Sequence, residues 1–206
     1  LNIKNQFEHK RANIHVDFKS TIIDRLYIKK NLTDYDIIHF AGHCEYDQYN
    51  PKNSGWVLSD GKFTIHDILN MGQAASLPAL IFSNACYSAQ GLLRGSLDGD
   101  YQKKNYSLAA AFLFSGVRHY LGSVRKIEDS ASLAFAKEFY HHLILGKSVG
   151  ESVRLGRVKL VKEYGITTMH WANYLVYGDP SFILFKPKPK ILKPRIGKNM
   201  KLRKIW

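Results

Sequence analysis

The chain has 206 residues, of which 45% are hydrophobic, 13% aromatic and 23% charged. This composition is typical of a globular domain, and it excludes a mostly disordered, collagen-like or coiled-coil protein. Two cysteines are too few for a secreted disulfide scaffold, and the longest apolar run, at 108–114, is too short to span a membrane. We therefore expect a soluble cytoplasmic protein that makes no membrane contact.

The net charge of +13 is concentrated at the C-terminal end. Residues 186–206 hold nine basic side chains and no acid, which leaves 21 basic and 17 acidic side chains in the rest. We predict one domain over 1–185 and a basic, Lys/Pro-rich tail over 186–206. Such a tail is either a solvated extension or an arm that binds nucleic acid or an acidic protein surface. Because the chain begins at Leu1, we also interpret it as a module whose N-terminal neighbour is missing.

Short apolar runs alternate with longer amphipathic runs along the first half of the chain. A run that alternates apolar and polar residues predicts a strand, apolar residues at helical spacing predict a helix, and Asp-Gly between two apolar runs predicts a hairpin. On these patterns we expect a strand at 14–18, a helix from a cap at Ser20 to Asn31, a strand at 36–42, a hairpin around 56–64 and a short helix at 64–70.

The second half repeats the alternation with longer helices. The expected elements are strands at 79–82, 119–124 and 173–177, helices at 108–116, 129–145 and 149–164, and an edge strand at 181–185. Strands that alternate with helices indicate βαβ units, and nearly continuous apolar strands indicate a sheet covered on both faces. The predicted fold is α/β, a three-layer αβα sandwich with a mainly parallel sheet.

Two of the predicted strands end on reactive side chains. His43 follows the run Phe-Ala-Gly at 40–42, and Cys86 follows Ser-Asn-Ala at 83–85. Functional residues in open α/β sheets lie beyond the carboxyl ends of the strands, so neighbouring strands would bring the two side chains to one edge. A histidine beside a cysteine raises its thiolate fraction and can later protonate the leaving amine, which is the chemistry of a nucleophile and its base.

A metal site is not expected. His39 lies four residues before His43, which in an extended strand places the two about 13 Å apart at ~3.3 Å per residue. The remaining histidines are scattered along the chain, so the sequence predicts neither a zinc centre nor another cofactor.

With these motifs in view, the sequence resembles the CHAT peptidases, which are caspase-like domains often fused to tetratricopeptide repeats and related to separase. The resemblance runs from about residue 14 to 185. It is carried by four motifs in order: HFAGH at 39–43, SNAC at 83–86, the segment 122–129, and WANY leading to YGDP at 171–180.

The resemblance implies a caspase-type fold and a cysteine endopeptidase with a Cys-His dyad. Cys86 matches the nucleophile and His43 the base, while the backbone N–H groups of Cys86 and Cys44 match the oxyanion donors. Asn84 and Asp129 match substrate-binding positions, and in separase-like members the acid lines the pocket for a basic P1 residue.

The chain departs from the family pattern at two positions near this predicted site. Cys44 stands where the family usually has glycine, which keeps the backbone N–H but adds a side chain. Arg125 stands where tryptophan is common, and it could neutralise Asp129 or reach the pocket itself. A basic, an apolar and an acidic P1 preference therefore all stay open.

Three functions follow from these observations. The leading hypothesis is an endopeptidase that cleaves specific protein partners and is held inactive until an N-terminal helical-repeat or sensor module activates it. The resemblance suggests bacterial antiviral defence or programmed cell death, and one version is a CRISPR-linked peptidase activated indirectly by RNA. The alternatives are a non-catalytic protein-binding module and a nucleic-acid-binding domain that uses the basic tail.

Overall fold

The computed structural model describes residues 3, 4, 7, 14–47, 49–71, 77–90 and 107–186. Seven strands lie in these ranges, listed with their bounds: β1 (Ile37–Ala41), β2 (Cys44–Glu45), β3 (Gly55–Leu58), β4 (Gly61–Thr64), β5 (Leu80–Asn84), β6 (His119–Ser123) and β7 (Tyr174–Tyr177). The helices are α2 (Arg25–Asn31), α3 (Ile65–Leu69), α4 (Leu108–Phe114), α5 (Asp129–Ile144) and α6 (Val149–Tyr164), with short 3-10 turns η1 (Pro51–Asn53), η3 (Ile166–Thr168) and η4 (His170–Ala172).

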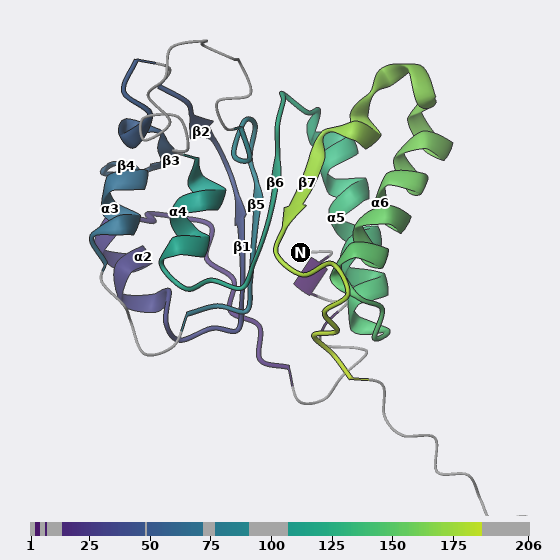
Figure 1. The fold of residues 1–206 in the computed structure, drawn as a ribbon, viewed down its shortest axis with the longest axis horizontal. Coiled ribbons are helices and arrows are strands. Elements are labelled where there is room, and N and C mark those ends of the chain that lie inside the picture. Colours follow the sequence, from purple (N-terminus) through teal and green to yellow (C-terminus); the bar gives the residue numbers. More distant parts are fainter. Residues whose placement is uncertain are drawn as a thin grey trace, which may run out of the picture.

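A four-stranded sheet in the order β1-β5-β6-β7 forms the centre of the fold. The first three of these strands are parallel, and β7 runs antiparallel to β6. Helices α5 and α6 cover one face, while α3 and α4 lie on the other (Figure 1). The predicted three-layer α/β sandwich with a mainly parallel sheet is therefore confirmed.

The alternation of side chains along β5 builds the two halves of the core. Leu80 and Phe82 are buried in the cluster under α5 and α6, whereas Ile81 is buried in the cluster on the opposite face. Side chains of a strand alternate between the two faces, so a strand buried on both faces must be apolar throughout. This requirement explains the unbroken apolar run that predicted the strand.

The second, smaller sheet is antiparallel and consists of β2, β3 and β4. Its β3–β4 hairpin turns at Ser59 and Asp60, and Gly61, the first residue of β4, has a φ of +126°, a backbone conformation that a residue with a side chain rarely adopts. Trp56 of β3 is fully buried and stacks on Phe40 of β1, with ring centroids 4.5 Å apart. The hairpin is thus fixed against the main sheet beside the end of β1.

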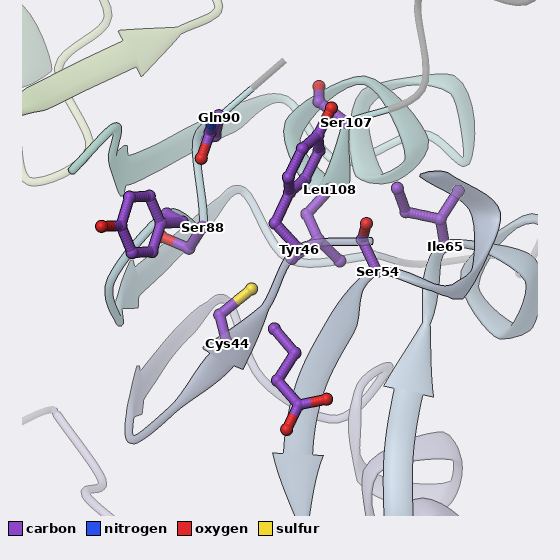
Figure 2. Close-up of a pocket in the computed structure, with 10 residues that line it drawn as sticks. Cys44, Tyr46, Ser54, Ile65, Ser88, Gln90, Ser107 and Leu108 are labelled. Carbon is purple, nitrogen blue, oxygen red and sulfur yellow. The ribbon is translucent and has the colours of Figure 1, made fainter. Parts of the chain in front are cut away.

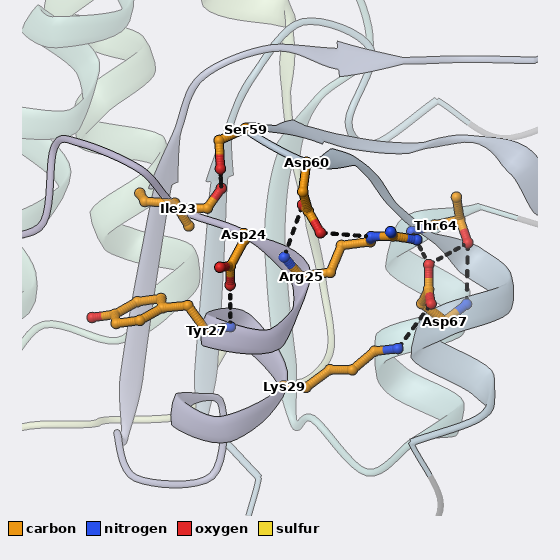
Figure 3. A network of polar contacts seen from close by, with 9 residues as sticks. All are labelled: Ile23, Asp24, Arg25, Tyr27, Lys29, Ser59, Asp60, Thr64 and Asp67. Carbon is orange, nitrogen blue, oxygen red and sulfur yellow. Dashed lines mark hydrogen bonds and ion pairs between the residues drawn. The ribbon is translucent and has the colours of Figure 1, made fainter.

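Helix α2 begins four residues later than the pattern around Ser20 predicted, with its cap at Asp24 instead of Ser20. Asp24 is the N-cap, and its carboxylate accepts the backbone N–H of Tyr27 at 2.6 Å. Ile22 has a φ of +49°, which no right-handed helix can contain. Figure 3 shows how Arg25 and Lys29 then anchor α2, through ion pairs with Asp60 at 3.0 Å and Asp67 at 2.9 Å.

Two predicted strands are absent, at 14–18 and at 181–185. In the first segment, Ile14 and Val16 do pack against the core, so the alternation reflected burial rather than strand pairing. In the second, Pro180 and Phe182 supply carbonyl oxygens to the backbone N–H groups of Gly150 and Val149 at the start of α6. These carbonyls complete a helix terminus, where the first N–H groups lack partners within the helix.

None of the described helices is long and apolar enough to cross a bilayer. The predicted tail at 186–206 lies outside the described residues, apart from Lys186.

We predict that His39 makes the fold sensitive to mild acid. Its ring lies against Phe82 and Tyr140, and this burial lowers its pKa from 6.5 to about 4. Between pH 6.5 and pH 4, the unfolded chain therefore binds a proton at His39 that the folded chain does not bind. The free energy of unfolding consequently decreases as the pH falls through this range. The loss should approach about 3 kcal/mol at pH 4.

Urea titrations at pH 7 and pH 4.5 measure this loss. His39→Gln should lower the free energy of unfolding at pH 7 but reduce its decrease between pH 7 and pH 4.5. His66→Gln, at an exposed histidine, should leave that decrease as in the wild type. An unchanged pH difference in His39→Gln would contradict the assignment.

Candidate active site

The pairing of β1 with β5 brings the two reactive side chains to one edge of the sheet. The strands are parallel and in register up to Ala41 beside Asn84. His43 and Cys86 each lie two residues beyond this last pair, past the carboxyl ends of adjacent strands. His43 is exposed and Cys86 is half-buried. The location matches the sequence prediction for this pair.

The backbone turns sharply at Cys86. After Asn84 the chain leaves the sheet in a turn, and Tyr87, next to the cysteine, has a φ of +60°. A bulky residue in this left-handed region costs on the order of 1–3 kcal/mol and persists only where the surroundings enforce it. Two backbone hydrogen bonds close the turn, from Ser88 to Ala85 at 3.3 Å and from Gln90 to Tyr87 at 3.0 Å.

His43 occupies the short connection between β1 and β2. Its carbonyl oxygen accepts the backbone N–H of Val57 at 2.9 Å, which ties this connection to the buried hairpin. Of the two nearby acids, Glu45 pairs with Lys62 at 3.2 Å and Asp47 accepts the backbone N–H groups of Tyr49 and Asn50. Within the described ranges no carboxylate pairs with His43, so no third residue is seen to orient its ring.

The two cysteines differ in environment. Both are free, and Cys44 lies in β2, where its half-buried thiol lines a shallow pocket with Tyr46, Tyr87 and Ser88 (Figure 2). Burial, reinforced by the nearby Cys86 and Glu45, raises the pKa of Cys44 to about 12. Only a thiolate is nucleophilic, so the side chain of Cys44 is a neutral wall of this pocket.

Asn84 is the last residue of β5, and its amide is held by a buried tyrosine. The hydroxyl of Tyr174 donates to Asn84 Oδ1 at 2.8 Å, and the Tyr174 ring stacks on Phe135 with centroids 3.6 Å apart. Tyr174 is fully buried, and burial raises its pKa, so it remains a neutral donor. This hydrogen bond engages the amide oxygen and leaves the amide nitrogen to donate at the sheet edge.

Asp129 is the first residue of α5 and is exposed. In the described part of the chain neither Asp129 nor Arg125 makes an ion pair, and no hydrogen bond links Asp129 to the dyad. The preceding loop is fixed instead by Asn173, whose backbone carbonyl accepts from Val124 at 2.9 Å and whose side chain donates to Lys126 at 3.4 Å. The carboxylate of Asp129 is therefore available to a ligand.

Sequence reasoning missed three residues that support this edge. Ser88, Asn173 and Tyr174 each join segments that are distant along the chain, such as Tyr174 and Asn84, which are 90 residues apart. The WANY motif at 171–174 contains two of them, but it served only to carry the family resemblance and assigned no role to Asn173 or Tyr174. Among the described residues, no group of three or more metal-ligating side chains is present.

The structure thus places a cysteine and a histidine at the carboxyl edge of a mainly parallel sheet, between two helical layers. The CHAT domain profile matches residues 7–179, and the chain therefore belongs to the CHAT domain family. No match was found among curated proteins.

Solved structures share the fold at low sequence identity. The Arg-specific cysteine proteinase gingipain R (RGPB) has a TM-score of 0.64 and 15% identity, over 88% of this chain and 41% of that chain. The complex of the pro- and mature domains of RgpB from Porphyromonas gingivalis gives the same TM-score and identity, over 88% and 42%. A structure described as a protease has a TM-score of 0.54 and 12% identity, over 77% and 37%. The chain thus spans about two fifths of these proteins.

We predict that a thiol reagent distinguishes the two cysteines in the folded protein. With a pKa of about 12, Cys44 is a thiolate in only about one molecule in 10⁴ at pH 8, so iodoacetamide should leave it unmodified while it labels Cys86. Peptide mass spectrometry measures the two sites separately, and both should react in urea. Labelling of Cys44 in the native protein as fast as Cys86 would contradict the assignment.

Proposed function

We propose that the chain is a cysteine endopeptidase in which Cys86 is the nucleophile and His43 is the general base. The observation that carries the proposal is the register of β1 and β5, which ends with Ala41 beside Asn84, two residues before His43 and Cys86 respectively. Membership of the CHAT domain family and the fold shared with cysteine proteinases support it. The raised pKa of the half-buried Cys44 thiol disfavours its thiolate, which favours Cys86 as the nucleophile of the two cysteines in the chain.

The proposed reaction follows from the chemistry of this pair. His43 takes the proton of the Cys86 thiol, and the thiolate attacks the carbonyl carbon of the scissile peptide bond. The backbone N–H groups of Cys86 and Cys44 would stabilise the resulting oxyanion. His43 then protonates the leaving amine, and a water molecule, deprotonated by His43, hydrolyses the thioester and regenerates the thiol.

We further propose that the substrates are specific protein partners and that an N-terminal helical-repeat or sensor module controls the site. The setting we infer is bacterial defence or programmed cell death, in which a nucleic-acid-linked signal, such as a CRISPR-derived one, acts through that module. Support comes from the family resemblance.

Replacement of either dyad residue should abolish cleavage. Cys86→Ala and His43→Ala are each expected to lower kcat/KM by about 10³-fold or more, because each removes half of one nucleophilic unit. Cys44→Ala is the matched cysteine control, and its loss should be far smaller because the backbone N–H remains. Cleavage of a proteome-derived peptide library, read by mass spectrometry of the new termini, measures all three. Wild-type cleavage by Cys86→Ala would contradict the proposal.

We propose a basic P1 residue, recognised by Asp129. Its carboxylate is exposed and unpaired among the described residues, and a charge-assisted contact with arginine or lysine contributes about 1.5–3 kcal/mol. Gingipain R, which shares the fold, is an Arg-specific proteinase, and a basic P1 residue is consistent with that likeness.

Peptides that differ only at P1 test this preference. Wild type should favour Arg or Lys by about 10-fold or more over Leu, and Asp129→Ala should lose the preference. Efficient cleavage after Leu that is unaffected by Asp129→Ala would assign Asp129 to the start of α5 alone, and a preference for Glu or Asp would indicate that Arg125 reaches the substrate.

A further inference from the structure

Ser88, two residues after Cys86, is fully buried and joins three parts of the fold. Its hydroxyl donates to the carbonyl oxygen of Ser83 in β5 at 2.8 Å. The hydroxyl oxygen of Ser88 in turn accepts the backbone N–H of Ser123, at the end of β6, at 3.2 Å. One side chain thus connects the turn that carries Cys86 to the ends of both strands beside it.

Other hydrogen bonds fix the backbone of the same turn. Tyr120 donates its hydroxyl to the carbonyl oxygen of Ser88 at 2.9 Å, and the backbone N–H of Ala89 donates to Ser123 at 2.8 Å. Tyr177 donates its hydroxyl to the carbonyl oxygen of Ala89 at 3.1 Å. The turn is therefore held by the two strands that follow it in the sheet.

The packing leaves little room for the turn to move. At Gly122 of β6, an added Cβ atom would lie 2.8 Å from Ser88 Oγ, so the absence of a side chain there lets the strand approach the hydroxyl. On the other side of Ser83, the indole N–H of Trp56 donates to the serine hydroxyl at 2.8 Å. Figure 2 shows Ser88 at the edge of the pocket that Cys44 also lines.

Given the proposed endopeptidase, we infer that Ser88 is a positioning residue that sets the location of the Cys86 thiol relative to His43. Cys86 lies midway between Asn84, the last residue of β5, and Ser88, so the two ends of this five-residue segment are both fixed to the sheet. The strained Tyr87 within the segment would relax if one end were released. Without the hydroxyl, the nucleophile would lose its alignment although the core stays intact.

Ser88→Ala tests this inference. We expect kcat to fall by about 10- to 100-fold with KM changed less than about 3-fold, since a small displacement of a reacting group has an effect of this size. The rate at which iodoacetamide labels Cys86 is also measured across pH 5–9. Replacing His43 by Ala should change this pH profile in the wild-type background but should leave it unchanged in the Ser88→Ala background. Because an unfolded chain would also be labelled without dependence on His43, the rates are measured on protein that circular dichroism shows to be folded.

Ser152→Ala is the matched control. Ser152 is equally buried and donates its hydroxyl to the carbonyl oxygen of Ser148 at 2.8 Å, but it lies at the start of α6, away from the dyad. This variant should lose a similar amount of thermal stability yet keep kcat within about 2-fold of the wild type. An equal loss of kcat in both variants would overturn the inference.

If Ser88→Ala does not fold, Tyr120→Phe removes a different hydrogen bond to the same turn while it keeps the ring, and it should lower kcat several-fold. Wild-type kcat in a folded Ser88→Ala or Tyr120→Phe protein would overturn the role of Ser88 and leave the proposed function intact. Activity that survives Cys86→Ala would instead overturn the proposed function.

Discussion

The parallel pairing of β1 with β5 is the constraint on which the rest of the structure depends. The register places Ile37 beside Leu80 and ends with Ala41 beside Asn84, so the segments that follow both strands leave the sheet at one edge. A slip of one residue would exchange the two faces of β5, so that Phe82 and Ile81 would each point into the core cluster on the opposite face of the sheet. The same burial that stabilises the core thus determines that His43 and Cys86 lie at one edge of the sheet.

The site rests on polar groups that are buried beneath it and satisfied by one another. Ser83, Ser88 and Ser123 are fully buried, and a buried polar group left without a partner costs about 1–3 kcal/mol. Their hydrogen bonds, together with those of Trp56 and Tyr120, join the two sheets and the Cys86 turn. Because strands rather than long loops hold the partners, the turn that carries Cys86 is attached directly to the sheet.

The sequence was most informative where burial dictates composition. The apolar runs of β1, β5 and β6 and the Asp-Gly turn of the hairpin were predicted, because a strand covered on both faces and a tight turn each need particular residue types. Residues 14–18 and 181–185 were predicted wrongly as strands, because apolar side chains can pack on a core without a paired backbone. Helix α2 was predicted to start too early, because the left-handed conformation of Ile22 leaves no signal in the sequence.

The candidate site was predictable only in its two main residues. Cys86 and His43 follow apolar strands, a pattern visible in the sequence, and the structure locates them at adjacent strand ends. The hydrogen bonds of Ser88 to Ser123 and of Tyr174 to Asn84 join residues 35 and 90 positions apart, so no local pattern indicates them. The resemblance supplied the roles of Asn84 and Asp129, which remain predictions.

A covalent probe that requires the catalytic reaction tests the central claim most directly. The thiolate of an activated cysteine displaces the carboxylate leaving group from the methylene carbon of a peptidyl acyloxymethyl ketone and forms a stable thioether. Intact-protein and peptide mass spectrometry locate the adduct. The account predicts a single adduct on Cys86, formed at least about 100-fold more slowly in His43→Ala. An adduct on Cys44, or labelling of Cys86 at the same rate without His43, would contradict it.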